Sequence, residues 1–145
     1  MLVYAAAVAH LSGIGGLHSG YRARDGDLLL TRIARSALPI IGTLDRYKAT
    51  HGVFPNSASA ADASALASDL PPSVKVVRQG GWLAFETGGP SPWTYYLLGS
   101  DGRSYTLSTK LGWDPRLAYR RSPAGAQWIF EPGDGSDQRF IDLRP

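Results

Sequence analysis

The sequence predicts an α+β fold, in which a long N-terminal helix, kinked near Pro39, packs on an antiparallel sheet of roughly four to six strands. Two observations favour this class. Apolar residues recur at alternating intervals of three and four between residues 27 and 51, as one face of a helix requires; they are Leu30, Ile33, Ala37, Ile40, Leu44, Tyr47 and His51. After Pro71-Pro72 the apolar period changes to two, as in strands, and the 17 Gly and 10 Pro indicate many turns.

The helix has recognisable start and stop residues. Asp25-Gly26-Asp27 breaks the preceding chain and offers a capping carboxylate, and Gly52 is suited to the left-handed residue that ends a helix. Pro39 lies inside this segment and removes one backbone hydrogen bond, so a kink is expected there.

The second half of the chain reads as hairpins. A short helix is expected at residues 62–70, followed by strand pairs at 74–77 with 82–85 and at 93–98 with 103–109. We expect a further strand at residues 126–130, and residues 138–143 are a candidate edge strand.

The length of 145 residues suits one domain, which we place at residues 25–145. Residues 1–24 form an apolar N-terminal segment that is too short for a full membrane span. Two interpretations stay open: a partial membrane helix with Tyr21-Arg22-Ala23-Arg24 as its basic flank, or a soluble helix buried on all sides.

Charge and composition exclude several classes of protein. The net charge is +3, and the basic residues are scattered, whereas a nucleic-acid reader would carry a basic stripe with interleaved aromatic residues. No nucleic-acid partner is therefore expected. With no Cys in the chain, disulfides and thiolate metal sites are excluded.

Motifs of catalysis are absent from the sequence. There is no H-E-x-x-H, G-x-S-x-G or S-x-x-K pattern, and His10, His18 and His51 have no metal-ligand spacing. Glu86 and Glu131 are interpreted as solvated strand ends. We therefore expect no catalytic residue and no organic cofactor, so that the chain is not an enzyme.

One polar loop is a candidate calcium site. Asp134-Gly135-Ser136-Asp137 places oxygen ligands of Asp134, Ser136 and Asp137 on a glycine-containing loop, as calcium prefers. The spacing differs from an EF-hand, and the same residues are also common in turns. Calcium is thus the candidate metal, with an ordinary turn as the alternative.

The end of the predicted helix resembles a known family. The segment Leu44-Asp45-Arg46-Tyr47-Lys48-Ala49-Thr50-His51-Gly52-Val53-Phe54-Pro55 is similar to the helix exit of type II secretion pseudopilins and type IV pilin-like proteins. Tyr47, Gly52, Phe54 and Pro55 would form a structural joint between helix and sheet. The resemblance spans about residues 30–110 and implies a pilin-like fold.

The resemblance also implies a function. It suggests a non-catalytic structural or interaction subunit of a secretion or pilus-type assembly, anchored in the bacterial inner membrane with a periplasmic domain. Its partners would be other envelope or secretion-system proteins, or further copies joined through the N-terminal helix. The basic prepilin leader is not found, which would leave a tethered or soluble relative. The alternatives are a periplasmic module that binds a glycan or peptide through exposed Trp and Tyr residues, and a small enzyme.

Overall fold

The computed structural model describes residues 20–145, which contain three helices and one sheet. The helices are α2 (Leu28–Arg35), α3 (Leu38–His51) and α4 (Ala60–Asp69). The strands are β1 (Lys75–Gln79), β2 (Trp82–Glu86), β3 (Trp93–Leu97), β4 (Tyr105–Lys110), β5 (Arg116–Ser122), β6 (Gly125–Glu131) and β7 (Arg139–Ile141). The apolar segment predicted at residues 1–24 lies outside the described residues, apart from residues 20–24.

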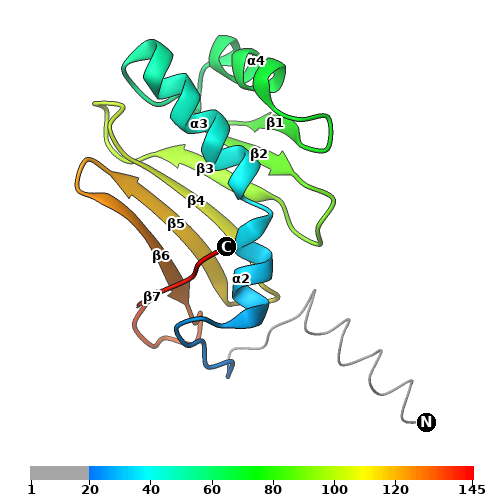
Figure 1. The fold of residues 1–145 in the computed structure, drawn as a ribbon, viewed down its shortest axis with the longest axis vertical. Coiled ribbons are helices and arrows are strands. Elements are labelled where there is room, and N and C mark those ends of the chain that lie inside the picture. The colour runs from blue at the N-terminus through cyan, green and yellow to red at the C-terminus, as the bar shows by residue number, and fades with distance from the viewer. Residues whose placement is uncertain (1–19) are drawn as a thin grey trace.

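The prediction of one long N-terminal helix is wrong. Helix α2 ends at Arg35 and α3 begins at Leu38 (Figure 1). Between the two helices, the Ser36 amide donates a hydrogen bond to the Ile33 carbonyl and the Ala37 amide donates to the Ala34 carbonyl, both at 3.0 Å. Pro39 has no N–H group, so a continuous helix would lose one backbone hydrogen bond at this residue. The first turn of a helix needs no such donor, and Pro39 accordingly lies in the first turn of α3.

The two predicted ends of this helical region are present. The Asp27 carboxylate accepts a hydrogen bond from the Leu30 amide at 3.1 Å and so caps α2. Gly52 ends α3 with φ of 82°, and its N–H donates to the Lys48 carbonyl at 2.7 Å. This φ is accessible to glycine at little cost, which explains the stop.

The sheet is larger than predicted. Within the described residues it has seven strands in the order β1-β2-β3-β4-β5-β6-β7, with every neighbouring pair antiparallel. The expectation of a pilin-like long helix on four to six strands is therefore incorrect. Three short helices accompany a continuous meander in its place (Figure 1).

The core lies between the helices and one side of the sheet. In antiparallel strands, cross-strand neighbours point to the same side, so the register defines the two sides. The helix-facing side includes Phe85, Trp93, Tyr95, Tyr105, Leu107, Leu117 and Phe130. They form one cluster with Leu30, Ala37, Ile40 and Leu44 of the helical region and with Leu66 of α4. The other side of the sheet is thereby left without a helix from the described part of the chain.

Candidate functional site

The residues predicted as a joint meet where α3 leaves the helical layer. Phe54 is buried, and its amide donates to the Gly102 carbonyl in the turn between β3 and β4 at 2.8 Å. Its ring meets that of Tyr105 edge to face, with centroids 4.7 Å apart. Lys48 Nζ lies over the Phe54 ring, 4.9 Å from its centroid. The helix exit is therefore held against the sheet.

A buried hydrogen bond extends this contact. The Tyr95 hydroxyl of β3 donates to the Pro55 carbonyl at 2.6 Å. Tyr47 lies one turn before the helix end and stacks on His51, with ring centroids 3.9 Å apart. These contacts give the residues a packing role. Their role as a structural joint stays a prediction.

We expect Tyr95→Phe to lower the free energy of unfolding by about 1–3 kcal/mol, because the Pro55 carbonyl loses its buried donor. Tyr96→Phe is the matched control: Tyr96 points to the opposite side, is 41% exposed and donates no hydrogen bond to the described residues. Urea denaturation of both variants measures the difference. Equal stability losses would contradict the importance of the Pro55 contact.

The same variant has a pH signature. Burial raises the pKa of Tyr95 well above its usual range, whereas the unfolded chain loses this proton near pH 10. The folded state therefore holds more protons above that pH, so stability is complete below about pH 10 and falls as the pH rises further. We expect a shallower alkaline fall for Tyr95→Phe than for the parent.

Polar side chains gather between α3 and α4. Desolvation, followed by the nearby Asp62 carboxylate, raises the pKa of Tyr47 to about 12. Arg46 Nε donates to Asp69 across the two helices at 3.0 Å, and both side chains are exposed. A tyrosine that keeps its proton to such a pH is no base at neutral pH, so this cluster is better suited to tying the helices together.

The predicted calcium residues lie in the loop between β6 and β7. Asp134, Ser136 and Asp137 line one cavity of about 370 Å³, but Arg22 and Arg139 line it as well and would repel a cation. Both the hydroxyl and the amide of Ser136 donate to Asp134 Oδ1, and these bonds lower the pKa of that carboxyl. Within residues 20–145 no three His, Cys, Asp or Glu side chains are grouped as metal ligands. The calcium site stays a prediction.

The side of the sheet turned away from the helices carries exposed aromatic residues. We call it the open face, and its central residues are Trp82, Ala84, Thr94, Tyr96, Thr106, Ser108, Ala118, Arg120, Ile129 and Phe140. Trp82 is 40% exposed, Tyr96 41% and Phe140 63%. The register of β2 and β3, continued by one residue, places Trp82 directly opposite Tyr96. Two aromatic side chains therefore lie side by side on the open face, next to the smaller residues Ala84 and Thr94.

The charge of the open face is positive. Its ionisable residues are Lys75, Lys110, Arg116 and Arg120 against Glu86 and Glu131. Lys75 lies opposite Glu86 and Arg116 opposite Glu131, which leaves Lys110 and Arg120 without a cross-strand carboxylate. The excess positive charge favours a negatively charged partner.

Two polar atoms of this face lack partners within the described chain. Thr106 Oγ1 and Arg120 Nε belong to cross-strand neighbours, are buried and make no hydrogen bond. An unsatisfied buried polar atom costs about 1–3 kcal/mol. A ligand that draws the Arg120 side chain toward itself would relieve part of this cost.

No protein-family model, curated protein or solved structure matches this chain. Among residues 20–145, no helix has the length and apolar character needed to cross a membrane.

The sequence did not locate the open face, because it does not separate the exposed aromatic residues of the β half from the buried ones. The structure divides them by strand parity. Trp93 and Tyr95 are buried and Tyr96 is exposed within one strand. The alternation of polar residues in 104–108, opposite Tyr96, would have been the usable signal. Trp113 is 91% exposed and lies in the loop between β4 and β5, off the strands.

Proposed function

We propose that this chain is a non-catalytic binding domain whose open face binds an acidic polysaccharide. The observation that carries the proposal is the exposed pair Trp82 and Tyr96, which lies beside Arg120 on the side of the sheet that no described helix covers. Flat, amphipathic rings offer an apolar surface next to water, which suits the faces of sugar rings. Arginine binds carboxylates through two parallel hydrogen bonds.

The rest of the face supports the same ligand class. The half-buried Thr94 adds a hydroxyl group beside the aromatic residues, which already pairs with Ser108 at 3.1 Å and keeps a free lone pair for a sugar hydroxyl. The open face extends across several strands, each about 4.8 Å from the next, and so can accommodate an extended polymer chain. Exposed aromatic patches of this kind on a soluble surface mark interaction sites. This corresponds to the binding-module alternative raised by the sequence.

Binding to alginate, a linear polymer of acidic sugars, tests the proposal. We expect the parent to bind alginate and to lose affinity as salt is raised, because screening weakens the contacts of Arg120 and Lys110. Trp82→Ala and Tyr96→Ala should each weaken binding by about tenfold, the effect of removing a central aromatic contact. Isothermal titration calorimetry measures both effects.

Two controls make the experiment specific. Trp113→Ala removes an exposed tryptophan outside the strands and should leave alginate affinity unchanged. Neutral dextran should bind at least tenfold more weakly than alginate, since it offers nothing to the cations. Single-stranded DNA that binds more tightly than alginate, or alginate affinity that survives both aromatic substitutions, would contradict the proposal.

A subunit role in a secretion or pilus-type assembly, with its envelope location, stays a prediction of the sequence resemblance. The left-handed Gly52 and the buried Phe54 agree with the resembling segment. The long helix on which such assembly would depend is absent from residues 20–145. The open face is consequently the stronger basis for a function.

A further inference from the structure

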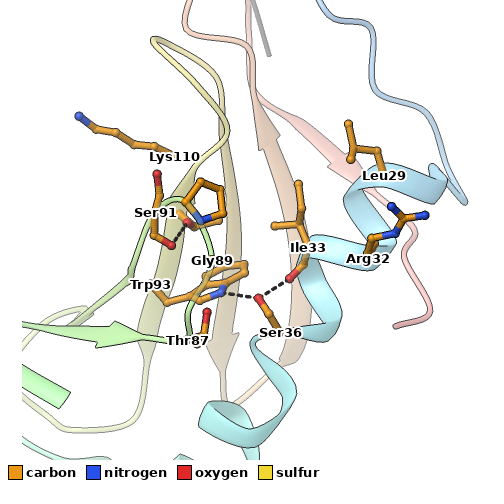
Figure 2. Close-up of a pocket in the computed structure, with 11 residues that line it drawn as sticks. Leu29, Arg32, Ile33, Ser36, Thr87, Gly89, Ser91, Trp93 and Lys110 are labelled. Carbon is orange, nitrogen blue, oxygen red and sulfur yellow. Dashed lines mark hydrogen bonds between the residues drawn. The ribbon is translucent and has the colours of Figure 1, made fainter. Parts of the chain in front are cut away.

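A second candidate site lies on the helix-bearing side of the sheet and reaches its edge at Lys110, a residue that it shares with the open face. A cavity of about 220 Å³ separates α2 from the loop between β2 and β3 and from the end of β4 (Figure 2). Leu29 and Ile33 form its helix wall, and Pro90 and Trp93 face them. Most of the lining is apolar, so the cavity favours an apolar group.

The floor of the cavity is fixed by hydrogen bonds. Trp93 is only 1% exposed, and its Nε1 donates to Ser36 Oγ at 2.9 Å. The Ser36 hydroxyl donates in turn to the Ile33 carbonyl at 2.7 Å, as the dashed lines of Figure 2 show. Because these groups are already paired, the floor offers a ligand mainly apolar contact. A preformed floor also lowers the ordering cost of binding.

The rim of the cavity is positively charged. Arg32 and Lys110 line it from opposite walls, and no Asp or Glu is among its described lining residues. Both cationic side chains are exposed, and neither makes an ion pair or a side-chain hydrogen bond with the described chain. Figure 2 shows both charged ends extending away from the indole. Long unpaired side chains can turn toward an anion at the mouth without breaking an interaction.

Hydroxyl groups complete the polar part of the site. Thr87 and Ser91 line the cavity, and their hydroxyls make no hydrogen bond with other described residues. Each can donate to a carboxylate oxygen. Apolar walls with donors and cations confined to the rim match a ligand with an apolar body and one negative charge.

We propose that this cavity binds a small aromatic monocarboxylate, with its ring on Trp93 and its carboxylate between Arg32 and Lys110. The volume supports one ring, since a dry protein cavity of about 150 Å³ already holds benzene. The absence of acidic lining residues favours a carboxylate over a neutral or cationic analogue. The cavity shares Lys110 with the open face, and its other lining residues lie outside that face.

Phenylacetate and its neutral analogue phenylacetamide test this assignment. We expect phenylacetate to bind the full chain at least about tenfold more tightly than phenylacetamide, because only the acid gains the charged contacts. Replacing both cations, Arg32→Gln with Lys110→Gln, should reduce the affinity of the acid to that of the amide. Ligand-observed NMR titrations give both affinities.

Two further variants distinguish binding inside the cavity from a general effect of the protein's charge. Arg35→Gln with Lys75→Gln removes the same charge at exposed positions that do not line the cavity and should leave phenylacetate affinity unchanged. Gly89→Leu adds a side chain at the wall, where a Cβ would meet only Thr87 Oγ1 at 3.7 Å, and should block both probes. No phenylacetate binding at millimolar concentration, equal affinity for acid and amide, or unchanged affinity in Gly89→Leu would overturn the proposal.

Discussion

Leu44→Ala should lower the free energy of unfolding by about 2–5 kcal/mol, the usual range for a buried leucine truncated to a cavity. Leu44 is 0% exposed and belongs to the cluster that joins α3 to the sheet. The alanine leaves a space that the other side chains of this cluster fill only in part. Urea denaturation of both proteins, fitted with one common denaturant dependence of the unfolding free energy, measures the loss of stability.

Leu28→Ala is the matched control for this experiment. Leu28 also lies in a helix, but it is 83% exposed. Its truncation should change the free energy of unfolding by less than about 0.5 kcal/mol. A loss of that small size at Leu44 as well would show that the helix-facing core is not where the structure places it.

The position of Leu44 illustrates what the helical periodicity could predict. The spacing of apolar residues indicated which side chains face the core, and Leu30, Ala37, Ile40 and Leu44 are indeed buried. The same spacing continues across Ser36 and Ala37, so it gave no sign that two helices share the stripe. The break depends on one missing donor at Pro39 and on the bond from Trp93 to Ser36, a contact between residues 57 positions apart.

Strand β5 shows why the sheet was underestimated. Its sequence, Arg116 to Ser122, contains Arg116, Arg120 and Arg121 and lacks a run of β-branched residues. The segment pairs with β4 from Arg116 to Arg121 and with β6 from Arg116 to Ser122. Its conformation is therefore supplied by neighbouring strands, which local propensity does not record. Long arginine side chains can also cover a sheet surface while their charged ends reach water.

The candidate sites were predictable to different degrees. The joint residues could be named from the sequence because a glycine stop and the following Phe54 and Pro55 are local in sequence. The open face combines Trp82, Tyr96 and Arg120 from three strands, so predicting it would have required the register of strand pairing. Predicting the cavity at Trp93 would have required the packing of α2 against the sheet, because its two walls come from α2 and from segments more than 50 residues later.

Gly133→Ala should lower the free energy of unfolding by about 2–4 kcal/mol, through backbone strain and a steric clash together. Gly133 has φ of 75°, a conformation that costs residues with a Cβ about 1–2 kcal/mol. A Cβ placed there would lie 2.6 Å from both Cβ and the carbonyl oxygen of Asp114. Because the carbonyl is backbone, the loops before β5 and before β7 must move apart.

Gly135→Ala isolates the strain from the clash. Gly135 lies two residues later in the same loop with φ of 89°, but a Cβ there would meet nothing within 4 Å. We expect it to lose only about 1–2 kcal/mol, the cost of the backbone conformation. Thermal and urea unfolding of the two variants beside the parent give the difference. If both alanines cost the same, the close approach of Gly133 to Asp114 does not hold the two loops together, and the small size of residue 133 serves its backbone conformation alone.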